Sequence, residues 1–141
     1  VLMLDLDHFK VVNDRHGHAV GDKVLVEFSA LIRASTRQVD RFFRYGGEEF
    51  VLLLSPVSAA SLGAIADKLV AKVAAELRCA GKPITVSIGG ATLRPGDDVR
   101  TWMARADACL YKAKRLGRNR AEIVAEAPSP AAEELQHDSA R

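Results

Sequence analysis

Apolar residues recur along the chain with two different spacings. Short, mostly apolar runs at Val1–Leu6 and Ile84–Leu93 are typical of buried strands. In three longer segments the apolar residues return every three or four positions, which predicts helices. One helix spans Asp22–Ala34, one begins after an N-cap at Ser58, and one spans Asp98–Leu116.

The same spacing predicts which side of each helix faces the core. Gly117 is the expected C-cap of the third helix, because glycine readily ends a helix. The inward residues are Leu25, Phe28, Leu31 and Ile32 in the first helix, Leu62, Ile65, Leu69, Val73 and Leu77 in the second, and Val99, Trp102, Met103, Ala106, Leu110 and Ala113 in the third.

Two runs of strand-forming residues within Arg41–Leu54 flank the pair Gly46-Gly47. This pattern predicts a tight β-hairpin, because glycine accepts positive φ at no steric cost. A second turn is expected at Gly81-Lys82-Pro83, and Ala121–Val124 is a short last strand. The resulting order, β-α-β-β-α-β-α-β, predicts an α+β domain with a largely antiparallel sheet flanked by helices.

Composition narrows the function classes. The 141 residues carry 20 Lys and Arg against 18 Asp and Glu, a net charge of +2 that favours neither nucleic acid nor a membrane surface as partner. The sequence shows no apolar stretch of transmembrane length and no signal peptide. Cys79 and Cys109 are expected to be free thiols in a reducing cytoplasm.

The two ends of the chain bear on its domain organisation. Residues 1–124 are expected to form one domain, whereas residues 125–141 are rich in Ala, Pro, Glu and Ser and are predicted to be a disordered tail. The chain begins with Val1 inside a strand pattern, so we expect it to be a fragment of a longer protein.

Three carboxylates are candidates for a metal site. Asp5 ends the first apolar run, and Glu48 and Glu49 directly follow the glycine pair. Neighbouring acids at a turn repel each other unless a hard cation lies between them, and Mg²⁺ prefers oxygen ligands together with substrate phosphates. A strand end and a neighbouring hairpin tip can bring these side chains to one metal ion.

Five blocks of the sequence together resemble the GGDEF family of diguanylate cyclases, in its variant with Glu at the third position of the signature. The resemblance covers roughly residues 1–124. The blocks are Asp5-Leu6-Asp7-His8-Phe9-Lys10 with Asn13-Asp14, Gly17-His18 and Gly21-Asp22; Arg44-Tyr45-Gly46-Gly47-Glu48-Glu49-Phe50; Thr85-Val86-Ser87-Ile88-Gly89; Ala106-Asp107-Ala108-Cys109-Leu110-Tyr111-Lys112-Ala113-Lys114; and Gly117-Arg118-Asn119.

The resemblance implies a palm-like fold, as in nucleotide cyclases, and a two-metal site for Mg²⁺, with Mn²⁺ as an alternative. Asp5, the backbone carbonyl of Leu6, and Glu48 would bind metal. Glu49 would either support a metal or take a proton. Lys10 would lie close to the phosphates, where a fixed cation offsets charge that grows in the transition state.

The resemblance also implies how GTP is held. Asn13 and Asp22 would read the guanine edge, and His18 would help to hold the nucleotide. Adenine lacks the pair of donors that Asp22 would accept, so GTP is favoured over ATP. The remaining residues implied to contact the phosphates are Gly46, Gly47, Lys114 and Arg118.

A further motif, Arg37-Gln38-Val39-Asp40, ends shortly before the hairpin turn, at the spacing of the family's inhibitory product site. Arg37 and Asp40 would bind cyclic di-GMP there. Lys68 falls where the family often has an Arg that closes the same site. Lysine keeps the charge but loses the planar fork that bridges guanine.

The sequence therefore predicts a diguanylate cyclase that condenses two GTP into cyclic di-GMP and two pyrophosphates, with feedback inhibition by the product. Catalysis would need a homodimer, because each domain holds one GTP. The family usually carries a helix with an Asn-Arg motif before the first strand, and this chain lacks it. The alternatives are a non-catalytic module that binds GTP or cyclic di-GMP, and a related cyclase or polymerase palm that uses another nucleotide.

Overall fold

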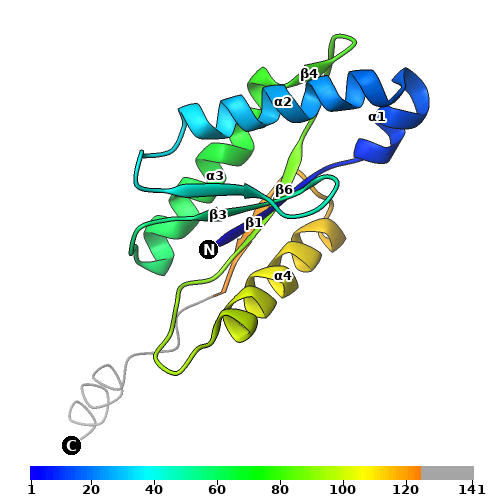
Figure 1. Cartoon of the computed structure of the whole chain (residues 1–141). Coiled ribbons are helices and arrows are strands. Elements are labelled where there is room, and N and C mark those ends of the chain that lie inside the picture. Colours follow the sequence, from blue (N-terminus) through cyan, green and yellow to red (C-terminus); the bar gives the residue numbers. More distant parts are fainter. Residues whose placement is uncertain (125–141) are drawn as a thin grey trace, which may run out of the picture.

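A computed structural model describes residues 1–124 of the chain (Figure 1). Five strands form the main sheet in the order β2-β3-β1-β6-β7. The predicted tail, residues 125–141, lies outside the described residues. The strands are β1 (Leu2–Leu6), β2 (Arg41–Arg44), β3 (Glu49–Leu53), β6 (Val86–Gly90) and β7 (Ala121–Ile123).

Most strand pairs in this sheet are antiparallel. β1 lies at the centre, between β3 and β6, and β2 pairs with β3 at one edge. Only β7 runs parallel to its neighbour, β6. The prediction of a largely antiparallel α+β sheet is therefore confirmed.

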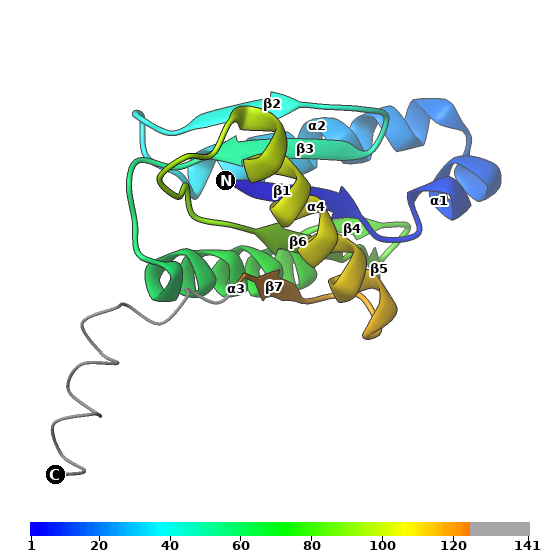
Figure 2. The ribbon, with the colours of Figure 1, turned by 90° about the horizontal axis from the view of Figure 1, so that it is seen from below.

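Helices cover both faces of the sheet (Figure 2). Alternate residues of β1 divide between the two faces, as the two-residue period of a strand requires. Leu2, Leu4 and Leu6 belong to the larger apolar cluster, which includes residues of α2 (His18–Ala34) and α3 (Ala59–Glu76). Val1 and Met3 belong to the second cluster, which includes Ala106 and Leu110 of α4 (Val99–Arg115).

A short helix, α1 (Phe9–His16), was missed by the pattern analysis. It buries only Phe9 and Val12, so its apolar signal is weak. Gly17, with φ of 83°, separates it from α2, which begins at His18, earlier than the predicted Asp22. Glycine tolerates this left-handed region, so the chain can turn sharply between the two helices.

The two later helices match their predictions closely. Ser58 caps α3 by accepting a hydrogen bond from the Ser61 amide, as predicted. Asp98 caps α4 in a reciprocal capping box with Thr101. The prediction that Val99 faces inward is wrong, because Val99 is exposed at the first turn of α4. Leu116 is the C-cap of α4, and the predicted Gly117 follows it with φ of 118°.

The segment between α3 and β6 also differs from the prediction. Arg78–Cys79 (β4) and Lys82–Pro83 (β5) form a small separate hairpin, so Lys82 and Pro83 belong to a strand and not to a turn. The strand predicted over Ile84–Leu93 is limited to Val86–Gly90, because its partner β1 supplies pairing residues only from Leu2 to Leu6. In residues 1–124 no helix is both long and apolar enough to cross a membrane.

Candidate active site

The end of β1 meets the hairpin loop as the sequence predicted. Asp5 pairs with Glu49 in the antiparallel register of β1 and β3. The amide of Leu6 donates a hydrogen bond of 3.2 Å to the carbonyl oxygen of Glu48. Residues from two distant parts of the chain are thus fixed side by side by backbone pairing.

A lysine from α4 completes this cluster. The Nζ atom of Lys114 lies 2.6 Å from Oδ2 of Asp5, and Asp5 is 4% exposed. Burial raises the pKa of Asp5 above its ordinary value, although the hydrogen bond and charge of Lys114 and the charge of Arg118 oppose this rise. Arg118 follows the end of α4, so both predicted phosphate-binding cations lie near the Asp5 carboxylate.

Glu48 shares the electrostatic environment of Asp5. Burial raises the pKa of Glu48, and the negative charges of Asp5 and Glu49 raise it further, against the opposing charge of Lys114. Carboxylates that repel each other in this way are stabilised in their ionised form by a bound cation. The assignment of Asp5 and Glu48 to a shared metal ion stays a prediction.

The donor set suits a hard divalent cation that also binds substrate. Within residues 1–124, no three side chains of His, Cys, Asp or Glu form a group that could hold a metal ion. Mg²⁺ commonly takes only one or two protein carboxylates and completes its shell with water and substrate phosphates. The pair Asp5 and Glu48 fits that pattern, whereas a dedicated protein cage is not present among these residues.

The hairpin loop is wider than predicted, and its glycines do not use positive φ. The amides of Tyr45 and Gly46 both donate to the carbonyl oxygen of Glu49, at 2.8 and 3.1 Å. Neither Gly46 nor Gly47 lies in the left-handed region. A β-carbon at Gly47 would meet nothing within 4 Å, so the outer side of this glycine is open.

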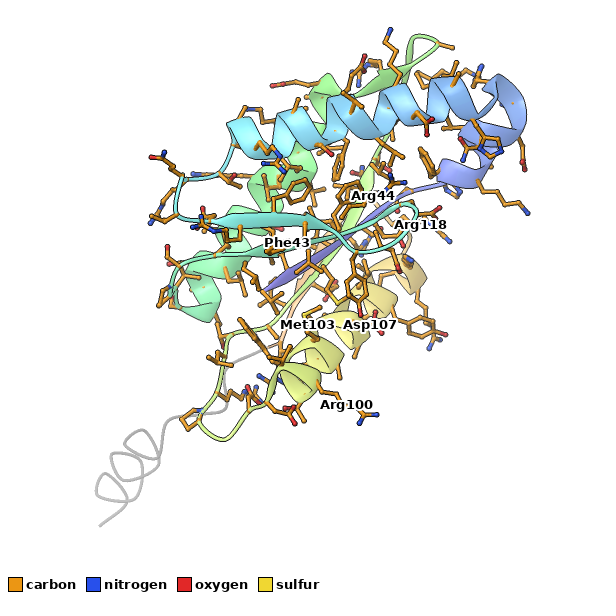
Figure 3. All side chains as sticks on the ribbon, viewed as in Figure 1. Phe43, Arg44, Arg100, Met103, Asp107 and Arg118 are labelled. Atoms are coloured by element: carbon orange, nitrogen blue, oxygen red, sulfur yellow. The ribbon has the colours of Figure 1, made fainter. Side chains whose placement is uncertain are left out.

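Arg44 contacts this loop from the end of β2. Its Nε atom donates to the carbonyl oxygens of Gly46 and Gly47, at 3.1 and 3.2 Å, and its Nη2 atom donates to Gly47 at 2.7 Å. Figure 3 shows Arg44 and Arg118 at the end of the sheet where the loop lies. Sequence reasoning assigned Arg44 no role.

A groove between α2 and the hairpin holds one of the two predicted guanine-reading residues. It has a volume of about 640 Å³, and its lining includes Asp22, Arg44 and Phe50. Asn13 approaches the same helix from α1, because its Oδ1 atom occupies the space that a β-carbon on Gly21 would fill. The structure therefore places Asn13 next to the turn of α2 that carries Asp22.

Two of the predicted site residues have no direct link to the carboxylates. Lys10 on α1 and His18 at the start of α2 are exposed. Among the described residues, no hydrogen bond or ion pair joins either side chain to Asp5, Glu48 or Glu49. Their assignment to nucleotide binding stays a prediction.

Asp7 has an organising role that sequence reasoning missed. It is 5% exposed and accepts hydrogen bonds from Thr85 Oγ1 and Ser87 Oγ, both at 2.7 Å, and from the amide of Asn119 at 3.0 Å. Asp7 thereby fixes the loop after α4 that carries Arg118. No local pattern marked this role, because Asp7 follows the end of β1 and its partners lie far along the chain.

Two of the three residues predicted for the product site, Arg37 and Asp40, lie together, and Lys68 lies apart from them. Arg37 and Asp40 line one small pocket together with Ile65 of α3. Both oxygens of Asp40 accept backbone hydrogen bonds, from the amide of Arg37 at 2.9 Å and from that of Ser55 at 3.1 Å. Lys68 is exposed one turn further along α3 and is not part of the pocket lining.

The sequence also matches known proteins. The profile of the family described as "Diguanylate cyclase, GGDEF domain" matches residues 1–120. Diguanylate cyclase A of Treponema denticola is 39% identical over 127 residues, which cover 87% of this chain and 34% of the relative. The response regulator PleD of Caulobacter vibrioides is 36% identical over 130 residues, covering 84% of this chain and 27% of PleD.

Solved structures give the same result for the fold. The active GGEEF domain of a diguanylate cyclase from Vibrio cholerae superposes with a TM-score of 0.82 at 32% identity, covering 89% of this chain and 82% of that one. The GGDEF domain of DgcB from Caulobacter crescentus, in complex with c-di-GMP, gives 0.81 at 35% identity, covering 86% and 75%.

The chain belongs to the GGDEF domain family of diguanylate cyclases, and its palm-like α+β fold is the fold of that family. It spans about a third of the length of Diguanylate cyclase A and a smaller share of PleD.

Proposed function

We propose that this chain is the catalytic domain of a diguanylate cyclase, which condenses two GTP into cyclic di-GMP and two pyrophosphates. The observation that carries the proposal is the convergence of Asp5 from β1, Glu48 from the hairpin loop and Lys114 from α4. Carboxylates and a fixed cation at one point suit the transfer of a nucleotidyl group between oxygens.

In the proposed reaction, the 3′-hydroxyl of one GTP attacks the α-phosphorus of the other, and pyrophosphate leaves in line. Members of this family generally use divalent metal ions, and Asp5, the Leu6 carbonyl and Glu48 would hold them. Bound Mg²⁺ or Mn²⁺ would polarise the attacked phosphoryl group and neutralise the attacking and leaving oxygens. Glu49, which pairs with Asp5 across the strands, would support a metal or accept the proton.

The substrate would extend from the α2 groove to the end of α4. Asp22 lines that groove, and Asn13 lies beside it, so the guanine edge would bind there. Lys114 lies 2.6 Å from Asp5, and Arg118 follows the end of the same helix, so both would receive the terminal phosphates. Gly46 and Gly47 would allow the phosphates to approach the loop, and Lys10 and His18 would contact the nucleotide from α1 and α2.

Catalysis would require two domains that face each other, because each holds a single GTP. A cytoplasmic location would follow from the use of GTP.

Product inhibition would act through Arg37 and Asp40, with Lys68 as an additional cation. Two supports are the shared pocket of Arg37 and Asp40 and the fact that two solved DgcB structures are described as complexes with c-di-GMP. In this chain, Asp40 would have to bind product while it still accepts two backbone amides.

The deciding experiment incubates the full-length protein with GTP and Mg²⁺ and follows cyclic di-GMP and pyrophosphate by chromatography. We expect one cyclic di-GMP for every two pyrophosphates, and no cyclic product from ATP. Metal-dependent GTP binding without either product would overturn the enzymatic proposal in favour of a nucleotide-binding module.

A further inference from the structure

We propose that Arg44 is a positioning residue, which fixes the hairpin loop so that the phosphates and the carboxylate of Glu48 meet in the correct geometry. This inference rests on the proposed function, because it concerns the same site. It arises from the contacts between the Arg44 side chain and the Gly46 and Gly47 carbonyls.

The Arg44 side chain holds two consecutive peptide groups of the loop. Arginine can do this because its guanidinium presents five N–H donors in a rigid plane. Lysine carries the same charge but offers a single ammonium on a flexible stem, so it cannot bind both carbonyls with the same geometry. Charge alone therefore does not account for the arrangement.

The direction of these carbonyls determines where the neighbouring amides point. In a trans peptide the C=O and N–H groups point in opposite directions, and no described peptide bond is cis. Because the Gly46 and Gly47 carbonyls face Arg44, the amides of Gly47 and Glu48 face away from it. The hydrogen bonds of the described backbone include no acceptor for either amide. Consecutive amides that point to one side favour an anionic ligand.

Other contacts hold the rest of the loop, so the peptide groups that Arg44 orients can be identified. The Glu48 carbonyl accepts from Leu6, and the amides of Tyr45 and Gly46 donate to Glu49. These contacts fix the two ends of the loop. The peptide planes of Gly46 and Gly47, which lie between them, are oriented by Arg44. Because glycine has no β-carbon to restrict φ and ψ, these planes can rotate when Arg44 is removed.

A direct contact with the base is the competing explanation, because Arg44 also lines the groove that contains Asp22. The two explanations differ in which part of GTP is affected. If Arg44 positions the loop, its replacement weakens binding of the phosphates and leaves binding of the nucleoside unchanged. If Arg44 contacts the base, its replacement weakens binding of the nucleoside and of the nucleotide by the same factor.

The test compares two ligands in the full-length protein and in its Arg44→Lys variant. The ligands are guanosine and 3′-deoxy-GTP with Mg²⁺, which lacks the attacking hydroxyl and so cannot be cyclised. Arg41→Lys is the matched control, because Arg41 donates to the carbonyls of Gln38 and Val39 at the opposite end of β2. Binding is measured by calorimetry, and thermal unfolding reports the stability of each variant.

We expect Arg44→Lys to weaken 3′-deoxy-GTP about tenfold, as the loss of a hydrogen-bonding arrangement to a charged ligand would. Guanosine affinity and the melting temperature should stay at wild-type values, and Arg41→Lys should bind both ligands normally. Equal losses for both ligands, or no loss for 3′-deoxy-GTP, would overturn the positioning role. A wild-type protein that binds both ligands but makes no cyclic di-GMP would refute the proposed activity and still test Arg44. A wild-type protein that binds neither ligand would overturn both.

Discussion

The carboxylate of Asp5 and the ammonium of Lys114 lie 2.6 Å apart, although the two residues are 109 positions apart in the sequence. Asp5 stands at the end of the central strand, and Lys114 lies in the last turn of the helix that covers it. The pKa of Asp5 is nevertheless raised, so the penalty of burying the carboxylate exceeds the benefit of its lysine partner. We therefore expect the ionised carboxylate to reduce the stability of the metal-free fold.

Asp5→Asn should stabilise the metal-free fold at neutral pH. A carboxyl group with a raised pKa in the folded state contributes stability below its unfolded pKa and loses it as pH rises through the folded value. Asparagine removes this loss. The advantage of the variant should therefore be largest near pH 7 and should disappear below about pH 4. Thermal unfolding across this range, in a buffer with a chelator, measures the effect.

Asp97→Asn is a control, because its effect on stability at neutral pH should be opposite to that of Asp5→Asn. Its hydrogen bond to Arg105 is the main reason that the pKa of Asp97 is lowered to about 2. The stability from this carboxylate is present above its unfolded pKa and is lost as pH falls through about 2. Asp97→Asn should be less stable than the wild type at pH 7. A destabilised Asp5→Asn at pH 7 would contradict the first prediction.

Glu48→Gln should nearly abolish formation of cyclic di-GMP and leave the protein folded. The change keeps the shape of the side chain but removes a charge that would hold metal, so we expect a loss of about a hundredfold or more in turnover. Glu122→Gln is the control, because Glu122 only pairs with the exposed Lys112 at 3.0 Å. Initial rates with saturating Mg²⁺ measure both variants, and normal turnover in Glu48→Gln would remove Glu48 from the metal site.

Asp22→Ala and Gly21→Ala should both reduce the preference for GTP over ATP. Asp22→Ala removes the proposed guanine acceptor, which is worth about 1–3 kcal/mol. In Gly21→Ala the new methyl group displaces the Asn13 side chain, because Oδ1 of Asn13 occupies that space. Helix stability should not suffer, because alanine favours a helix over glycine by about 1 kcal/mol.

Competition between GTP and ATP for turnover measures this selectivity. Ser29→Ala is the control, because Ser29 lines the same groove and has no assigned role. Unchanged selectivity in both variants would mean that guanine is read elsewhere.

Much of the fold follows from local patterns, because burial alone determines the apolar spacing of β1, α3 and α4. The elements that local patterns missed are short or bury few residues. α1 buries only two residues, and β4 and β5 are each two residues long. None of these three elements therefore shows a clear period of apolar residues. Val99 matched the inward period of α4 but lies at its first turn, beyond the part of the helix that covers the sheet.

The candidate site likewise has a part that the sequence predicts and a part that it does not. The convergence of Asp5 and the hairpin was predictable, because a strand end and a neighbouring hairpin tip share one edge of a sheet. The roles of Arg44 and Asp7 were not, because both depend on where the side chain reaches in three dimensions. The spacing of Asp40 identified its motif but not the two backbone amides that it already accepts.

Gly89→Ala should strongly destabilise the domain. A β-carbon at this position would overlap the backbone nitrogen of Leu110 and the carbonyl oxygen of Ala106, which are parts of a rigid helix. Accommodating it would force α4 away from β6, at a cost of about 3 kcal/mol or more. Gly63→Ala in α3 is the control, because its β-carbon would make only an ordinary contact at 3.8 Å with Ile123. Chemical denaturation should show a loss for Gly89→Ala and a small gain for Gly63→Ala. Equal stabilities would contradict this close packing of α4 on the sheet.

Arg37→Ala should abolish tight binding of cyclic di-GMP and raise the end-point yield, with little change in the initial rate. The Arg37 side chain is exposed, and its backbone amide, not its guanidinium, holds Asp40. The substitution therefore removes the fork that would bind guanine and leaves the loop intact. Asp40→Ala would be less informative, because it also releases the amides of Arg37 and Ser55.

Lys68→Arg provides the complementary change at the same site. It restores a planar fork on α3, so product should bind about tenfold more tightly if Lys68 faces the bound ligand. Gln38→Ala is the control within the motif, since its side chain has no assigned role. Calorimetry with cyclic di-GMP measures all three variants. Wild-type affinity in Arg37→Ala would eliminate this product site, and unchanged affinity in Lys68→Arg would remove Lys68 from it.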